Sequence, residues 1–202
     1  MKRTIYAYLL VALVLTTEAF GQRVNLKSGD TDVLTGQKTL NVEYDYSDFG
    51  VGKFATEKEY LDKKSAEYNA KEAGKGDTWK KMWVEDRKNR FEPKFEELFN
   101  KGLEGKGVAL VGGRADSKYT LIVRTKFVEP GFNVGVMRKN AAVDFDIDIV
   151  ETANKSKKVA EMSMDKVPGG MFGGFDFDTG ARLAESYAKA GKVLANYLEK
   201  KM

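Results

Sequence analysis

The clearest periodic pattern in the chain is a strict alternation of apolar and acidic residues. The apolar set is Val143, Phe145, Ile147 and Ile149, and the acidic set is Asp144, Asp146 and Asp148. Successive side chains of a strand point to opposite faces of a sheet, so this segment predicts a strand with one buried and one solvated face. We expect the three aspartates to pair with lysines of a neighbouring strand.

Other segments predict the rest of a sheet. Alternation or short apolar runs predict four further strands, over residues 40–46, 108–111, 119–128 and 158–166. In the long strand over 119–128, alternation places Phe127 on one face and Val128 on the other. The last three strands, joined by a turn at Asn154-Lys155-Ser156, are expected to form an antiparallel meander.

Helical spacing predicts two helices between the first two strands. Thr56 and Glu59 form a capping box that begins a charged helix running to about residue 73. A second helix carries a bulky apolar stripe over 79–103, which we interpret as core. Pro93 is expected to kink this helix or to restart it as a shorter one.

A last helix is predicted over 179–200, because Leu183, Tyr187, Ala190, Leu194 and Leu198 recur at helical spacing. Asp178 or Thr179 caps its start. The element order is strand, helix, helix, strand, three antiparallel strands, helix. It predicts an α+β fold: one two-layer domain over 38–202, with a mostly antiparallel sheet of about five strands and helices packed on one face.

The first residues have the three-part layout of a secretory signal. Lys2 and Arg3 precede an apolar run over 4–15, which is too short for a membrane span of roughly 20 residues. Small residues at Ala19 and Gly21 suit signal peptidase, so we predict a signal peptide over 1–21. The polar, turn-rich segment 22–37 is expected to be a flexible N-terminal arm.

Composition narrows the possible functions. The chain has no histidine and no cysteine, which excludes an imidazole base, a thiolate nucleophile, nitrogen or sulfur metal ligands and a lipid-bearing cysteine. The net charge is only +4, with Lys and Glu interleaved, and this is not the basic stripe of a nucleic-acid binder. The expected protein is exported, periplasmic or secreted, soluble, not a lipoprotein, without cofactor and without a later transmembrane segment.

Three motifs resemble catalytic or metal sites. Asp178-Thr179-Gly180-Ala181 matches the turn of aspartic proteases, but too little chain follows it, so we interpret Asp178 as a helix cap. Ser186 and Lys189 have Ser-x-x-Lys spacing, which a lysine-rich chain contains by chance. The alternate aspartates of the strand over 143–149 lie about 6–7 Å apart, too far for one calcium ion to collect all three.

Two glycine-rich loops carry the candidate binding surface. The connection over 129–140 and the exit over 167–177 are expected to emerge at the same end of the sheet. The candidate binding residues on them are Phe132, Val134, Met137, Arg138, Met171, Phe172 and Phe175. Glycine lets such loops adapt, and binding residues concentrate on loops. The alternative is that the apolar side chains fold down as a lid and belong to the core.

The segment Ala115-Asp116-Ser117-Lys118-Tyr119-Thr120-Leu121 leads into the long hairpin. With the element order, it resembles envelope domains of the curli-secretion lipoprotein and penicillin-binding-protein-activator kind, over residues 38–200. This resemblance implies an α/β accessory domain that binds other envelope proteins and is not an enzyme. The chain departs from that group because it lacks the lipid-bearing cysteine.

These observations predict an exported, non-catalytic binding or assembly module of the bacterial cell envelope, with an envelope protein as its partner and no nucleic acid. Two alternatives stay open. One is a carboxylate-dependent glycan hydrolase, which two carboxylates about 5–10 Å apart across a cleft would favour. The other is a soluble binder of an apolar small ligand held between helices and sheet.

Overall fold

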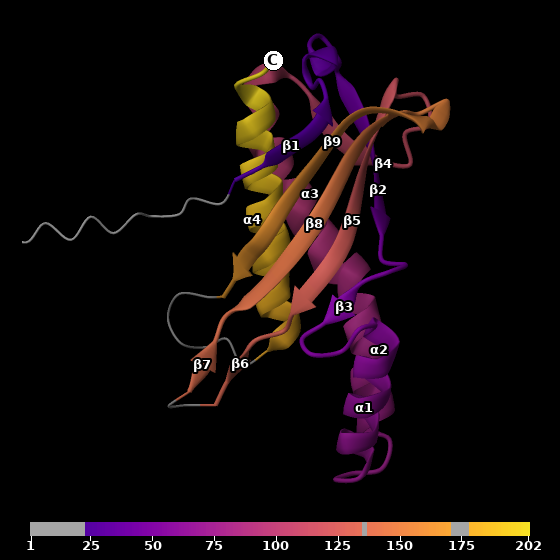
Figure 1. Cartoon of the computed structure of the whole chain (residues 1–202), viewed down its shortest axis with the longest axis vertical. Coiled ribbons are helices and arrows are strands. Elements are labelled where there is room, and N and C mark those ends of the chain that lie inside the picture. Colours follow the sequence, from indigo (N-terminus) through magenta and orange to yellow (C-terminus); the bar gives the residue numbers. More distant parts are fainter. Residues whose placement is uncertain (1–22, 135–136, 171–177) are drawn as a thin grey trace, which may run out of the picture.

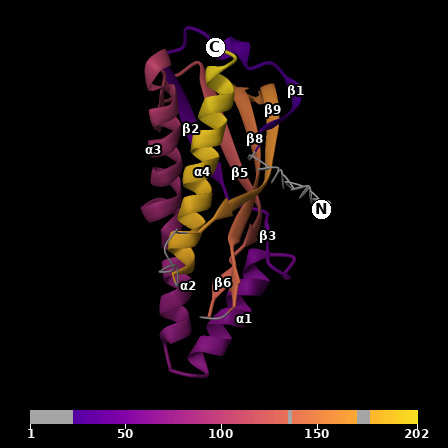
Figure 2. The ribbon, with the colours of Figure 1, turned by 90° about the vertical axis from the view of Figure 1, so that its left-hand side faces the viewer.

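The computed structural model describes residues 23–134, 137–170 and 178–202, and these form an α+β fold of two layers (Figures 1 and 2). The strands of the main sheet are β1 (Asn25–Gly29), β2 (Thr39–Asp45), β3 (Gly50–Val51), β4 (Ala109–Gly112), β5 (Tyr119–Glu129), β8 (Ala141–Glu151) and β9 (Asn154–Gly169). Two short strands, β6 (Phe132–Asn133) and β7 (Arg138–Lys139), form a separate hairpin.

The helices are α1 (Glu57–Asn69), α2 (Lys75–Asp86), α3 (Glu92–Leu103) and α4 (Thr179–Glu199). Helices α3 and α4 lie side by side on one face of the sheet, which we call the covered face, whereas α1 and α2 extend past the end of the sheet (Figures 1 and 2). The opposite face, the open face, carries no helix among the described residues. None of the helices in these ranges combines the length and the hydropathy of a membrane-spanning helix.

The sheet has seven strands and is mixed, which corrects the prediction of a mostly antiparallel sheet of about five strands. Its order is β1-β9-β8-β5-β2-β4, and β3 also pairs with β5. β2 runs parallel to both β4 and β5, while β5, β8, β9 and β1 form antiparallel pairs. The parallel pairs follow from the helical crossover between β2 and β4, because such a connection returns the chain in the same direction.

The loose arm expected over 22–37 is instead largely structured. Residues 25–29 form β1, which pairs with residues 160–163 of β9, and Leu34 is completely buried. β1 is exposed along its length and has no buried side-chain pattern to reveal it. Its order comes from backbone pairing with β9, and backbone groups leave no signature in the sequence.

A β-bulge in β5 corrects the faces assigned to Phe127 and Val128. The register shifts between Thr125 and Phe127, so Phe127 lies opposite Asp144 and Val128 lies opposite Val143. Val128 is therefore buried with the covered-face residues. One extra residue in a strand reverses the alternation beyond it, which strict period-two reasoning cannot anticipate.

The core fills the space between the covered face and helices α3 and α4. Its largest fully buried side chains include Phe95 and Phe99 of α3, Tyr187 of α4 and Phe145 of β8. The two helices approach closely at Gly191, where an added Cβ would lie 2.2 Å from the Phe95 carbonyl oxygen. Phe145 meets the Tyr187 ring edge-on at 5.0 Å between centroids.

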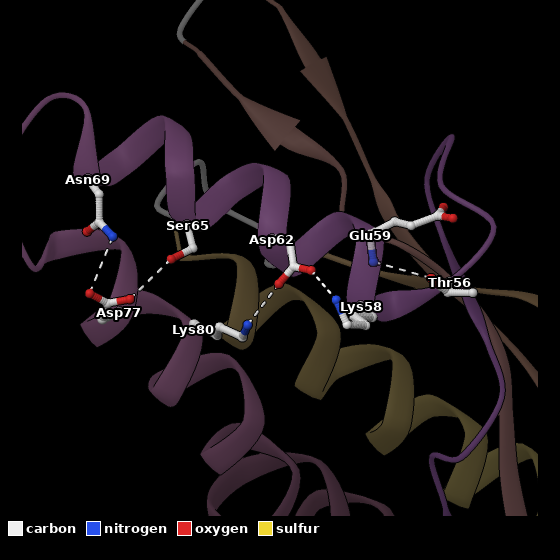
Figure 3. Close-up of polar contacts among 8 residues, drawn as sticks. All are labelled: Thr56, Lys58, Glu59, Asp62, Ser65, Asn69, Asp77 and Lys80. Atoms are coloured by element: carbon white, nitrogen blue, oxygen red, sulfur yellow. Dashed lines mark hydrogen bonds and ion pairs between the residues drawn. The ribbon is translucent and has the colours of Figure 1, made fainter.

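The α1–α2 hairpin is held by polar contacts along its length (Figure 3). The predicted capping interaction is present, since Thr56 Oγ1 accepts from the Glu59 N–H at 3.2 Å. Asp62 of α1 accepts from Lys80 of α2 at 3.0 Å, and Asp77 accepts from Asn69 at 3.3 Å. These contacts hold together two helices that have little sheet beneath them.

Helix α2 passes into α3 through a π-helical segment, Arg87–Phe91. Pro93 lies in the first turn of α3, so the helix restarts there, which is one of the two outcomes expected for it. The π segment turns Phe91 onto Tyr187, with stacked rings 4.8 Å apart, and turns Arg87 toward Glu57. The junction thus joins the projecting hairpin to the core.

Candidate functional site

The two glycine-rich connections leave the same end of the sheet, as the sequence predicted. Glu129 at the end of β5 lies opposite Ala142, and Gly169 at the end of β9 lies opposite Ala141. β5 and β9 are both antiparallel to β8, so their C-terminal ends coincide (Figure 1). The two connections therefore begin at the same end of the sheet, although they lie far apart in the sequence.

The first connection is a short hairpin of β6 and β7, in which Phe132 lies opposite Lys139 and the Val134 N–H donates to the Met137 carbonyl at 3.0 Å. Its apolar side chains face solvent: Phe132 is 43% exposed, Val134 60% and Met137 61%. These three side chains are therefore not part of the core. The other apolar candidates, Met171, Phe172 and Phe175, lie outside the described residues.

The base of this hairpin is held firmly. Arg182, a buried residue of α4, donates to the Pro130 carbonyl at 3.2 Å and to the Gly131 carbonyl at 3.4 Å. Glu129 accepts from the Lys139 ammonium at 2.5 Å, which joins the two strands beside the sheet. Charge-assisted hydrogen bonds of this kind are roughly twice as strong as neutral ones.

Gly131 is required at the hairpin base by its backbone. Its φ of +63° lies in the left-handed region, and an added Cβ would stand 2.4 Å from the Lys139 carbonyl oxygen. We expected this glycine to make the loop adaptable. In the structure it instead allows two strands to approach closely. The hairpin combines an anchored base with an apolar, exposed tip.

An open groove with a volume of about 780 Å³ lies beside the hairpin. Its lining comes from β7, the residue before β8, the end of β9 and helices α3 and α4, namely Leu98, Arg138, Asn140, Pro168, Gly169, Gly170, Glu185, Ala188, Lys189 and Lys192. Three of these side chains are cationic and one is acidic. Arg138, predicted as a binding residue, therefore lies where the hairpin and this basic groove meet.

Asp178 is the N-cap of α4, as the sequence predicted. Its Oδ1 accepts from the backbone N–H groups of Gly180 at 2.8 Å and Ala181 at 3.4 Å. Its Oδ2 pairs with Arg90 at 2.5 Å, and Arg90 also pairs with Asp86 at 3.0 Å. The Asp-Thr-Gly-Ala turn is therefore a helix start clamped to the π segment.

The carboxylates on either side of Arg90 have opposite pKa shifts. Burial raises the pKa of Asp86, although Arg90 opposes the shift. Burial acts in the same direction on Asp178, but the Arg90 guanidinium and the two backbone N–H groups outweigh it, so the pKa of Asp178 is lowered. Such divergence is also a feature of acid–base pairs in enzymes. Here burial explains the raised pKa of Asp86, and Arg90 with the backbone N–H groups explains the lowered pKa of Asp178.

The Ser-x-x-Lys pair does not form a nucleophile site. Ser186 is completely buried, and its hydroxyl lies where α4 packs on β9, so close that a Cβ on Gly169 would stand 2.4 Å from it. Lys189 is exposed and lines the neighbouring groove. Among the described residues the Ser186 hydroxyl is buried and has no hydrogen-bond partner, so Lys189 does not activate it.

The expected lysine pairing of the β8 aspartates is found for Asp146 and Asp148 but not for Asp144, which instead accepts the Lys166 backbone N–H at 2.6 Å. Only the lysine of Asp148 comes from an adjacent strand, since β9 separates β1 from β8. Asp146 binds Lys27 of β1 at 2.6 Å, and Asp148 binds Arg124 of β5 at 2.5 Å and Lys158 of β9 at 3.2 Å. Within the described ranges, no group of three or more acidic side chains is placed to hold a metal ion.

The anchor of the hairpin was missed by the sequence reasoning. Arg182 stands next to Leu183 in the first turn of the predicted last helix, where nothing distinguishes it from a solvated cation. The burial of Arg182 comes from the packing of α4, which the sequence pattern does not show. A cation on the buried side of a helix needs a partner, and here the partners are loop carbonyls.

The chain matches no protein-family model and no curated protein. Among solved structures it is similar to PelC dodecamers from Paraburkholderia phytofirmans in two crystal forms. The first has 11% identity and a TM-score of 0.36, and the match covers 85% of this chain and 99% of that one. The second has 12% identity and a TM-score of 0.37, and the match covers 86% of this chain and 96% of that one. A DUF330 protein from Xanthomonas campestris has 14% identity and a TM-score of 0.34, covering 53% of this chain and 60% of its own. Likenesses this weak establish no function.

Proposed function

We propose that this protein is an exported, non-catalytic binding or assembly module of the bacterial cell envelope, and that it contacts an envelope protein through the β6–β7 hairpin. The observation that carries the proposal is the contrast within that hairpin. Its base is fixed by Arg182 and by the Glu129–Lys139 pair, whereas Phe132 and Met137 project into solvent.

Exposed apolar side chains on a fixed support are what a protein interface uses. Burying one large apolar side chain gains roughly 1.5–3 kcal/mol, and aromatic residues and Met are enriched at interfaces. Because the hairpin base is already held, binding loses less conformational entropy than ordering a free loop would. The neighbouring groove adds Arg138, a residue type also enriched at interfaces.

The absence of an enzymatic role is part of the proposal. The chain has no histidine and no cysteine. The motifs that resembled catalytic sites have structural explanations, since Asp178 caps a helix and Ser186 is buried in helix packing. The export signal and the resemblance to envelope accessory domains support the location, which stays a prediction.

The test combines in-cell photo-cross-linking with matched substitutions. A photoreactive residue at Val134 should capture one stoichiometric envelope protein, and F132D/M137D should abolish that capture. The control M82D/V84D changes two exposed apolar residues of α2 and should leave capture intact; Met82 is 53% exposed. Melting temperatures of both variants should stay within about 2 °C of the wild type, since exposed positions carry little stability.

Two results would contradict the proposal. Equal capture by wild type and F132D/M137D would show that the hairpin is not the contact. Loss of cooperative melting in F132D/M137D would show that these side chains support the fold.

A glycan hydrolase is the second candidate, and the opposite pKa shifts of Asp86 and Asp178 make this the carboxylate pair to test for it. We expect pure protein to show no turnover of envelope glycans. Turnover that disappears in D86N, with the melting temperature retained, would establish the hydrolase and overturn the non-catalytic module. The third alternative, a binder of an apolar small ligand, stays a prediction.

A further inference from the structure

The two outer edges of the main sheet are treated differently. At one edge, β4 is closed by the side chain of Asn100 from α3. The Leu110 N–H donates to Asn100 Oδ1 at 2.6 Å, and Asn100 Nδ2 donates to the Leu110 carbonyl at 3.0 Å. An amide that binds both backbone groups of one residue occupies the place that another strand would take.

The other edge, β1, has no such closure among the described residues. β1 pairs with β9 on one side, and it is the terminal strand in the sheet order. All five of its residues are exposed. Lysines on an edge strand commonly prevent another strand from pairing there. Lys27 of β1 instead forms an ion pair at 2.6 Å with Asp146 on the open face. The outward backbone groups of β1 therefore face solvent.

A groove of about 340 Å³ runs between the start of β1 and the last turns of α4. Its lining is Arg23, Val24, Val193, Asn196, Tyr197 and Lys200. Val24, Val193 and Tyr197 pack against the core and give the groove an apolar floor. Leu26 lies opposite Met162 of the covered face, so its exposed side chain is on the same side of the sheet as this groove.

The charges of the groove have one sign. Arg23 and Lys200 are cationic, no carboxylate belongs to the lining, and neither cation forms an ion pair with a described residue. This contrasts with the α1–α2 hairpin, where exposed lysines pair with carboxylates, as at Lys58–Asp62 and Lys81–Glu85. A strand edge, an apolar floor and two unpaired cations thus lie together.

We infer that β1 accepts an extended, acidic segment of another protein as an added strand. Backbone pairing with β1 supplies register, apolar side chains at alternate positions lie on Val193 and Tyr197, and carboxylates bind Arg23 and Lys200. Five paired residues at about 3.3 Å each give a segment roughly 17 Å long. A second copy of the chain is the other occupant to test, since its β1, Asn-Leu-Lys-Ser-Gly, carries no carboxylate within the paired residues but is followed directly by Asp30.

The experiment uses the full mature chain and three synthetic hexapeptides. The first alternates Glu and Val, the second alternates Lys and Val, and the third replaces two Val of the first with Pro, which cannot donate backbone hydrogen bonds. Binding is measured by fluorescence anisotropy, and amide hydrogen exchange reports on residues 25–29. The protein variant R23E/K200E is compared with K63E/K81E, which reverses two exposed lysines of the α1–α2 hairpin.

We expect the Glu-Val peptide to bind and to slow amide exchange in β1, with the other two peptides at least tenfold weaker. R23E/K200E should weaken binding by about tenfold, whereas K63E/K81E should change it less than twofold. Equal binding of the Pro peptide, or unchanged exchange in β1, would overturn the added strand. If the protein dimerises without peptide and the dimer slows amide exchange in β1, the edge binds a second copy of the chain, and the inference of an acidic partner is wrong. The hairpin variant F132D/M137D should bind the peptide normally, so this inference and the proposed function fail separately.

Discussion

The two faces of β8 show how one strand can carry two kinds of stabilisation. On the covered face Val143, Phe145, Ile147 and Ile149 are all buried beneath the helices. On the open face Asp146 and Asp148 are held by cations from β1, β5 and β9. One face is stabilised by removing apolar surface from water and the other by pairing charges, so the two faces should respond very differently to substitution.

The largest effect is expected on the covered face. Phe145→Ala should lower the free energy of unfolding by about 3–5 kcal/mol, because it leaves a cavity and removes the edge-on contact with Tyr187. Chemical denaturation measures the loss. The matched control is Phe132→Ala at the exposed hairpin, where we expect a change within about 0.5 kcal/mol. Similar losses at the two sites would mean that the hairpin aromatic is part of the core.

A smaller effect is expected at the buried charge of the open face. Asp148 is only 3% exposed, between Arg124 and Lys158. Asp148→Ala should cost about 1–3 kcal/mol, since it leaves partly buried cations without their partner. Asp146→Ala removes an exposed pair with Lys27 and should cost about 0–1 kcal/mol. Equal losses at the two aspartates would show that burial does not distinguish them.

The smallest effects are expected on how the free energy of unfolding depends on pH. Two carboxylates on opposite sides of the sheet should change it in opposite directions. On the covered side burial raises the pKa of Glu96 above 4.5, although the hydrogen bond from Tyr44 opposes the shift. On the open side hydrogen bonds from Ser47 lower the pKa of Asp45 below 3.8 despite its partial burial, and Arg124 acts in the same direction. Unfolding free energies measured against pH for wild type, E96Q and D45N separate the two.

The sign follows from proton linkage. The charged form of Glu96 costs stability at neutral pH, and acidification through its raised pKa relieves that cost, so wild type gains relative to E96Q. The charged form of Asp45 contributes stability that is lost as the pH falls through its lowered pKa, so wild type loses relative to D45N. Parallel curves for all three proteins would contradict both assignments.

Much of the fold followed from side-chain periodicity. The strands β2, β4, β5 and β8 and the helix α4 lie close to their predicted ranges, because each buries one face and its sequence alternates accordingly. β1 and β3 were missed, since an exposed edge strand and a two-residue strand bury no periodic stripe. The mixed order of the sheet was missed because strand direction depends on how the crossover packs.

The candidate site was predicted in part. Glycine-rich composition and exposed apolar types indicated Phe132, Val134 and Met137, and the meander placed both loops at one end of the sheet. The anchor by Arg182 and the close approach at Gly131 could not be predicted. The first depends on a contact between residues 52 apart in the sequence, and the second on how closely the two strands of the hairpin approach at Lys139, neither of which composition records.

By itself the sequence determined the buried faces of β2, β8 and α4, the starts of α1 and α4, and which reaction chemistries lack their side chains. These are local properties, set by the period of the backbone and by the inventory of functional groups. Only the tertiary structure decided that β5 and β2 run parallel, that Arg182 holds a distant hairpin, and that one sheet edge is closed by Asn100 while β1 is open. Those outcomes depend on pairing between backbones and on which segments meet in space, and a side-chain pattern constrains neither.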